Sequence, residues 1–285
     1  MNFWSIQILN GLSLGMILFL LSAGLSVIFG VMRIINLAHG SFYLVGGYIA
    51  LTIILATDSF WLGLLVAPVL VGLAGAVVHR LLLQRVQNNE LAQVLLTFGV
   101  LLMISDLTVW IWGGLPRTLP RPEMFEGAVH IAGLVFPTYR VALTAAGVLA
   151  AILIWLVLER TLIGAIVRAG VDDEEMARGI GVRIGTVFTA VFAAGAALAA
   201  AAGVLGGALL GVYPGADFDV VLLAFAVVVI GGLGSLRGAF IGSLLIGLID
   251  TFGKALLPQY AMFTTFVPMA LMLAWRPTGL FGRAE

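Results

Sequence analysis

Long apolar segments separated by short polar breaks recur along the whole chain. Nine segments can be drawn, at about 6–29, 38–56, 60–83, 91–113, 139–158, 184–212, 218–236, 238–257 and 260–275. Most have about the length that a helix needs to cross the hydrocarbon core of a bilayer. The period-two alternation of a membrane β-barrel is absent. The pattern predicts an all-α, polytopic transmembrane helical bundle with about eight or nine spanning or re-entrant segments, in a single domain over 1–285.

Composition gives the same picture. Hydrophobic residues make up 62% of the chain and charged residues only 10%, whereas a soluble domain has about 25% charged residues. The first apolar segment is too long for the core of a signal peptide, and we expect it to be a retained membrane helix. Cysteine is absent, which excludes disulfides and thiolate metal sites. There is no Walker A sequence and no hydrolase or dinucleotide motif, so an enzyme is not expected.

The basic residues predict an orientation in the membrane. If the loop 159–183 is cytoplasmic, alternation of the segments puts ten arginines inside and four basic residues outside. The inside set is Arg33, Arg80, Arg85, Arg160, Arg168, Arg178, Arg183, Arg237, Arg276 and Arg283, and the outside set is Arg117, Arg121, Arg140 and Lys254. The positive-inside rule then predicts a cytoplasmic C-terminus. The N-terminus lies outside if all nine segments span, and inside if one is re-entrant, for which 38–56 and 218–257 are the candidates.

Three polar residues interrupt the apolar pattern between the first two segments. Arg33, Asn36 and His39 stand at an expected membrane boundary, and glycines including Gly40 and Gly46 follow them. Polar groups at such a position are costly unless they pack inside the bundle or face water. We interpret Arg33 as an anchor. Asn36 and His39 either bond to freed backbone at a helix start or contact a solute on a translocation path.

Two further places could belong to such a path. Asp106 lies within the fourth segment, where a carboxylate is a functional candidate, although it could equally bond to Ser105 or Thr108. Gly234 and Gly238 flank the short break around Arg237, which indicates a tight hairpin or a broken helix. The sixth segment is so rich in alanine and glycine that we expect it at the centre of the bundle.

The most charged stretch is the loop 159–183. Asp172 is expected to cap a short helix, with Glu175 three positions later as in a capping box. That helix would contain Ala177 and Arg178 and would stop at Gly179 and Gly181. It is either a solvated loop helix or a lever moved by a cytoplasmic motor.

The longest connection on the extracytoplasmic side is 114–138. It could hold a short hairpin or an interfacial segment at 128–136, and it could dock an extracytoplasmic partner.

Several motifs together resemble the permeases of branched-chain amino acid ABC transporters, of the LivH type. They are M-R-I-I-N-L-A-H-G-S-F-Y-L-V-G-G-Y (32–48), A-R-G-I-G-V (177–182), V-I-G-G-L-G-S-L-R-G-A-F-I-G (229–242) and R-P-T-G-L-F-G-R (276–283). The resemblance covers nearly the whole chain. Ser41 departs from it, since many relatives carry an acid there, and so does the very alanine-rich sixth segment.

The resemblance implies a transmembrane permease subunit of a bacterial ABC importer in the inner membrane. Its implied partners are a second permease of LivM type, two ATP-binding subunits, a periplasmic or lipid-anchored solute-binding protein and membrane lipid, with no nucleic acid. The chain itself would hold no cofactor, because ATP would be bound by the partner subunits, which would push on the ATPase-coupling loop at 159–183. The expected solute is a branched-chain amino acid, although the family also contains permeases for urea, amides and aromatic acids. The alternatives are a stand-alone ion-coupled transporter or channel, and a membrane scaffold.

Overall fold

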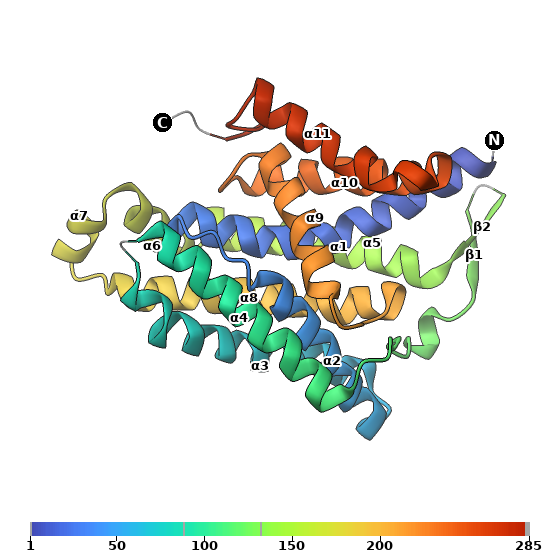
Figure 1. Cartoon of the computed structure of the whole chain (residues 1–285), viewed down its shortest axis with the longest axis horizontal. Coiled ribbons are helices and arrows are strands. Elements are labelled where there is room, and N and C mark those ends of the chain that lie inside the picture. Colours follow the sequence, from blue (N-terminus) through green and yellow to red (C-terminus); the bar gives the residue numbers. More distant parts are fainter. Residues whose placement is uncertain (1, 88, 132, 283–285) are drawn as a thin grey trace.

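A computed structural model describes residues 2–87, 89–131 and 133–282 as a bundle of helices (Figure 1). The long and medium helices are α1 (Asn2–Met32), α2 (His39–Thr57), α3 (Phe60–Leu81), α4 (Glu90–Trp112), α5 (Thr138–Arg160), α6 (Leu162–Asp172), α8 (Ile184–Leu210), α9 (Ala216–Gly231), α10 (Leu236–Leu256) and α11 (Ala261–Trp275). The shorter elements are α7 (Glu174–Gly179), the 3-10 turns η1 (Leu83–Arg85), η2 (Glu123–Phe125) and η3 (Pro258–Tyr260), and the strands β1 (Ala128–Ile131) and β2 (Leu134–Pro137). The predicted polytopic helical bundle is confirmed.

Seven helices of the described residues are long and apolar enough to cross a membrane. They are α1 to α5, α8 and α10, with α3 continuing through η1. The other two predicted segments are helical but shorter. With 16 and 15 residues, α9 and α11 are about 24 and 22 Å long at 1.5 Å per residue, against a hydrocarbon core of about 30 Å. In Figure 1, α9 also runs at a steep angle to α1, α8 and α10.

The centre of the bundle is α8, as its small residues predict. It packs against α1, α2 and α3. A Cβ atom placed on Gly46 of α2 would lie 2.5 Å from the Cα atom of Ala200 in α8, and one on Gly24 of α1 would lie 2.6 Å from the carbonyl oxygen of Gly195. Backbones this close exclude larger side chains, so glycine and alanine set the distance between these helices.

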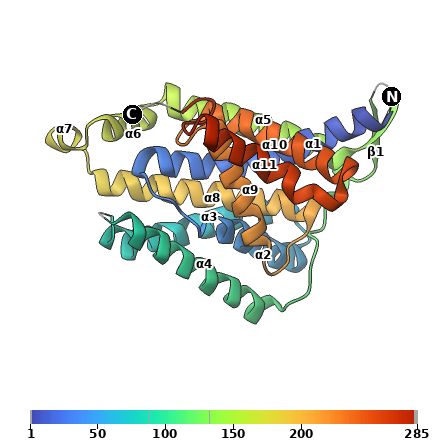
Figure 2. The ribbon, with the colours of Figure 1, turned by 45° about the horizontal axis from the view of Figure 1, so that its top comes forward.

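The two ends of the molecule carry different elements. The N-terminus lies at the same end as β1 and β2, whereas α6, α7 and the C-terminus lie at the opposite end (Figures 1 and 2). The strands form an antiparallel hairpin in which Ala128 pairs with Pro137, so of the two possibilities at 128–136 the hairpin is the one formed. Figure 2 shows α4 on the opposite side of the bundle from α5 and α10.

Candidate functional site

The chain between α1 and α2 enters the interior of the bundle without forming a helix. Arg33 ends α1 with a left-handed backbone at φ 55, a conformation that closes helices at their C-terminal end. Ile34, Asn36 and Ala38 in the following segment are buried. Irregular backbone at membrane depth is tolerated only where protein or a water-filled path supplies its hydrogen bonds.

Thr97 of α4 supplies part of those hydrogen bonds. Its hydroxyl accepts a hydrogen bond from the backbone N–H of Leu37 at 3.3 Å and lies 3.4 Å from the carbonyl oxygen of Ile35. Thr97 is fully buried. One side chain of a distant helix therefore holds the irregular segment 33–38 against α4. Nothing in the sequence singles out Thr97, because a lone threonine in an apolar helix is common.

His39, the first residue of α2, lies deep in the bundle. Its side chain is fully buried, and Nε2 lies 2.9 Å from the carbonyl oxygen of Leu21 in the middle of α1. A carbonyl oxygen only accepts, so Nε2 carries the proton and Nδ1 is an acceptor in a neutral imidazole. Nδ1 has no hydrogen-bond partner among the described residues. The bond to α1 therefore aims one acceptor of His39 at the interior.

Asp217 meets α2 from the other side. It lies in the first turn of α9 and is fully buried, and the positive end of the helix dipole favours a carboxylate there. Ser41 donates a hydrogen bond to its Oδ2 atom at 3.2 Å, whereas Oδ1 has no partner among the described residues. A side chain at Gly40 would collide with the backbone carbonyl of Asp217. Glycine at position 40 thus lets α2 and the start of α9 touch.

Several buried polar atoms on α1, α2, the break and α9 have no hydrogen-bond partner. Among the described residues, these atoms belong to Ser22, Ser26, Asn36, His39, Tyr48 and Asp217. Each such atom costs about 1–3 kcal/mol, and native proteins contain few of them. Their concentration on α1, α2, the break and α9 points to a site for a polar ligand. We call Asn36, His39, Ser41, Tyr48 and Asp217 the polar cluster.

Asp219, two residues beyond Asp217, has a different environment. It is exposed and accepts a hydrogen bond from the hydroxyl of Tyr213 at 2.8 Å. Burial and the neighbouring Asp219 raise the pKa of Tyr213 to about 12, so the phenol stays protonated as a donor at neutral pH. Neither aspartate is among the residues that the sequence marks as candidates for a path. The Y-P-G break before them is the signal that could have marked a helix start inside the bundle.

The structure separates the remaining candidates for the path. Gly46 of α2 packs against Ala200 of α8, and it shares α2 with His39, Ser41 and Tyr48. Asp106 is exposed on α4 and is not a member of the polar cluster. Gly234 does not lie on a helix with Gly238. It lies in the tight turn between α9 and α10 at φ 77, against Gly30, while Gly238 packs on Gly231. The predicted tight break is confirmed, at the opposite end of α9 from Asp217.

The charged loop 159–183 contains two helices rather than one. α6 runs to Asp172, and Asp173 caps α7 by accepting a hydrogen bond from the backbone N–H of Met176 at 2.8 Å. The predicted cap at Asp172 with Glu175 as its capping-box partner is therefore wrong by one residue. The reason is that α6 continues through Asp172, which leaves Asp173 as the first residue with the extended backbone that a cap needs.

The end of α7 is as predicted. Gly181 has φ 93, and its N–H donates to the carbonyl oxygen of Arg178. The N–H of Val182 donates to the carbonyl oxygen of Ala177. This is a Schellman motif closed by a left-handed glycine. Ala177 is buried, whereas Glu175, Arg178 and Gly179 are exposed. The result is a short, well-capped helix whose residues are mostly exposed on the surface of the protein.

Among the described residues no group of three or more histidine, aspartate or glutamate side chains is placed to hold a metal ion. The polar cluster can offer a carboxylate oxygen, an amide and an imidazole acceptor within an apolar bundle. These groups can bind a small polar or zwitterionic molecule.

Comparisons with known proteins agree with this geometry. Residues 7–275 match the family model described as branched-chain amino acid transport system / permease component. The chain is 30% identical to the high-affinity branched-chain amino acid transport system permease protein BraD of Pseudomonas aeruginosa, over 98% of this chain and 96% of that protein. It is 29% identical to LivH of Escherichia coli, over 98% and 96% of the two chains.

A second type of permease is also similar. LivM of Escherichia coli is 29% identical over 94% of this chain and 68% of that protein. The comparison with solved structures found no match. The match over residues 7–275, together with 30% identity to BraD over 98% of the chain, shows that this chain belongs to the family of permease components of branched-chain amino acid transport systems.

Proposed function

We propose that the chain is the transmembrane permease subunit of a bacterial ABC importer that carries branched-chain or closely related amino acids across the inner membrane. The observation that carries the proposal is the polar cluster, which is buried where α2 meets the start of α9. Two interrupted elements that meet inside a bundle are typical of transport sites. Relatives named as branched-chain amino acid permeases support the solute class.

The polar cluster suits a zwitterionic amino acid. The Oδ1 atom of Asp217 can accept from an α-ammonium group, and the side-chain amide of Asn36 can donate to an α-carboxylate. Beside Asp217, Phe218 packs edge to face on Phe98 of α4 with ring centroids 6.4 Å apart. Both rings are partly exposed and would offer an apolar surface to an aliphatic side chain.

Partner subunits would supply the energy. The chain has no Walker A sequence, so ATP would be bound and hydrolysed by two ATP-binding subunits docked on α7. Met176 and Ile180 expose 65% and 73% of their surface around this helix, which is typical of residues that bind a partner. A push on α7 would pass through α6 to the end of α5 and to α8, both of which contact α6.

A second permease would pair with this one across the face of α4. Asp106 and Trp110 of α4 are exposed, Trp110 by 83%, and a carboxylate facing hydrocarbon is expensive. A Cβ atom on Gly99, two to three turns before them on the same helix, would meet nothing within 4 Å. Pairing would cover the carboxylate and admit a neighbouring helix at Gly99. A similar chain named LivM supports a pair of related permeases.

The ends of the molecule would face different compartments. We assign α6, α7 and the C-terminus to the cytoplasm, because Arg160, Arg168 and Arg178 lie in this region. The N-terminus and the hairpin of β1 and β2 would then face the periplasm, where a solute-binding protein would deliver the amino acid.

Transport by the reconstituted complex tests the proposal. This chain, the second permease, the ATP-binding subunits and the binding protein are placed in proteoliposomes, and uptake of labelled leucine, isoleucine and valine is measured with and without ATP. We expect ATP-dependent uptake that unlabelled urea does not compete away. Asp217→Asn should lower uptake by about tenfold or more, the effect of one lost charge-assisted hydrogen bond.

The matched control is Asp219→Asn, which changes the same residue type on the same helix but at an exposed position. Uptake that is equal in both variants would contradict the role of the polar cluster. Uptake by this chain alone, driven by an ion gradient and without ATP-binding subunits, would contradict the importer and favour the ion-coupled transporter.

A further inference from the structure

A cavity separate from the polar cluster opens at the end of the molecule that carries α6 and α7. It has a volume of about 980 Å³. It lies between the end of α1, the corner where α5 turns into α6, the turn between α9 and α10, and the segment after α11. None of the residues of the polar cluster lines it. By the orientation proposed above, this end meets the cytoplasmic leaflet of the membrane.

Three arginines from three different elements line this cavity. They are Arg33 after α1, Arg168 in α6 and Arg237 in α10, and among the described lining residues Glu159 is the acidic one. All three arginines are exposed. The described lining residues thus carry a formal excess of two positive charges. They lie at the end of the bundle, where a membrane protein normally meets the polar headgroups.

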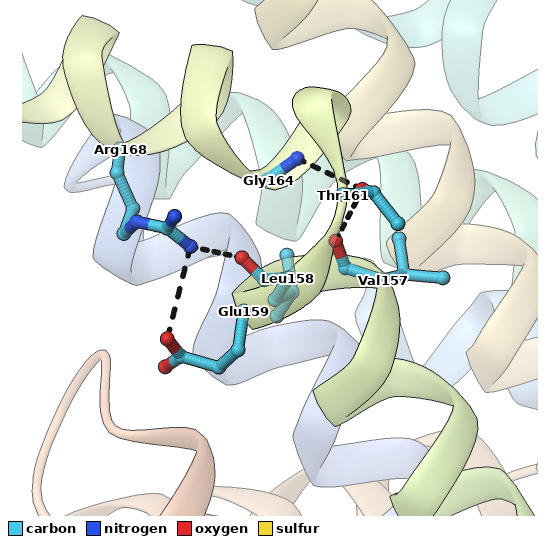
Figure 3. A network of polar contacts seen from close by, with 6 residues as sticks. All are labelled: Val157, Leu158, Glu159, Thr161, Gly164 and Arg168. Atoms are coloured by element: carbon cyan, nitrogen blue, oxygen red, sulfur yellow. Dashed lines mark hydrogen bonds and ion pairs between the residues drawn. The ribbon is translucent and has the colours of Figure 1, made fainter.

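Figure 3 shows how Arg168 is held at the α5–α6 corner. It donates to the carbonyl oxygen of Leu158, and its Nη1 atom lies 3.9 Å from the nearer carboxylate oxygen of Glu159. Thr161 between the two helices caps α6 by accepting from the N–H of Gly164 at 3.3 Å. Both contacts of Arg168 use one nitrogen of a guanidinium group with five N–H donors. An ion pair at 3.9 Å between half-exposed side chains is weak, so Glu159 compensates little of the positive charge of Arg168.

The rest of the cavity wall is apolar. Trp155 and Leu158 of α5, Val167 of α6, Leu233 and Phe281 all line it. Trp155 also carries Arg160 over its ring, with the guanidinium 5.4 Å from the ring centroid. A tryptophan beside arginines marks the interface between headgroups and hydrocarbon. The cavity therefore combines a basic part and an apolar part at the depth where a lipid has its phosphate and its first methylene groups.

We propose that this cavity binds the phosphate group of an anionic phospholipid from the cytoplasmic leaflet, with the acyl chains against the apolar wall. Guanidinium groups match phosphate oxygens in geometry and charge, and basic pockets between membrane helices on this side bind anionic headgroups. A soluble phosphate would use only the basic part. The bound lipid would connect α6, which leads to α7, with the turn between α9 and α10.

Lipid binding to the complete transporter tests the inference. The complex is purified, delipidated, exposed to equal amounts of phosphatidylglycerol and phosphatidylcholine, and analysed by native mass spectrometry. We expect retained phosphatidylglycerol, and about fivefold weaker retention in Arg237→Gln, since an interfacial arginine contributes about this factor. Arg168→Gln should act similarly, and Arg237→Lys should keep part of the binding because it keeps the charge.

Arg85→Gln is the matched control, because Arg85 is exposed and lines neither this cavity nor the smaller one beside α3. Equal losses in Arg85→Gln and Arg237→Gln would overturn the inference, as would equal retention of the two lipids.

Displacement of phosphatidylglycerol by inorganic phosphate at similar concentration would identify a soluble anion as the occupant instead. Lipid bound by the permease pair alone but absent from the complete transporter would mean that an ATP-binding subunit fills the cavity. Uptake is measured separately, so a negative result here leaves the importer assignment intact.

Discussion

The buried residues around the polar cluster differ in how far the sequence could reveal them. Asn36 and His39 interrupt an apolar pattern, so the local sequence marks them. Asp217 and Thr97 become informative only through partners far away in the chain, Ser41 and the backbone of residues 35–37. The pattern of apolar residues reports which positions avoid water, but it does not report which two distant polar residues meet. The contacts that Asp217 of α9 and Thr97 of α4 make with the segment 35–41 therefore could not be predicted from the sequence alone.

Removal of the Thr97 hydroxyl should destabilise the irregular segment between α1 and α2. In Thr97→Val the shape is nearly kept, but the N–H of Leu37 loses its acceptor and the carbonyl of Ile35 loses a nearby donor. An unsatisfied buried polar group costs about 1–3 kcal/mol, so we expect a fall of several degrees in the Tm of the purified permease. The change is measured by thermal unfolding in detergent.

Thr57→Val is the control for this substitution. Thr57 donates to the carbonyl oxygen of Ile53 on its own helix and is exposed. Its loss should change stability by less than about 0.5 kcal/mol. Equal Tm values for Thr97→Val and the unchanged protein would mean that Thr97 does not support the break.

At the scale of elements, hydropathy located every membrane helix but not how deep each one reaches. The sequence marks 38–56 and 218–257 as candidates for re-entrance but does not show where their helices begin. In the structure α2 begins beside the middle of α1, and α9 is only 16 residues long. An apolar helix is equally apolar whether it starts at the surface or inside the bundle.

The sequence does not reveal α6 as a separate helix. Its 11 residues are too few for a span, and its amphipathic pattern merges with the charged loop.

The cap of α7 gives a test of the local structure. Asp173→Ala removes the oxygen that accepts from the N–H of Met176, and loss of such a cap costs about 1 kcal/mol. We expect about fivefold faster hydrogen exchange of the amides in 174–179 by mass spectrometry. Asp172→Ala, at the end of the preceding helix, should leave this exchange unchanged. The opposite ranking of the two variants would restore the cap to Asp172.

Close packing of α2 on α8 should make Gly46 intolerant of even a methyl group. In Gly46→Ala the new Cβ atom would lie 2.5 Å from the backbone of Ala200, and overpacking of this kind costs about 1–3 kcal/mol. We expect a lower Tm of the isolated permease. Gly99→Ala on α4 has open space around it, so it should be neutral or slightly stabilising through helix propensity. Equal effects of the two substitutions would contradict the close contact.

For the whole molecule, α4 and α5 are the two faces on which the proposed second permease could pair. α4 and α5 are both peripheral, with only 22% and 11% of their spanning windows buried, and both are rich in exposed apolar residues. Lipid could cover either of them. They differ in one respect: the exposed face of α4 carries Asp106, whereas the exposed face of α5 includes apolar residues such as Leu149 and Leu153. A carboxylate favours protein over lipid as a neighbour.

The chain contains no cysteine, so single cysteines can map this contact directly. Trp110→Cys on α4 and Leu153→Cys on α5 are each labelled with a benzophenone maleimide in the assembled transporter and irradiated. We expect the probe on α4 to form a covalent adduct with the second permease and the probe on α5 to form none. Asp106→Leu should weaken the pairing about fivefold, because polar contacts between membrane helices contribute about 1 kcal/mol, whereas Leu149→Ala should not. If the probe on α5 reacts with the second permease and the probe on α4 reacts only with lipid, the pairing face lies on the opposite side of the bundle and Asp106 must be satisfied by water or lipid headgroups instead.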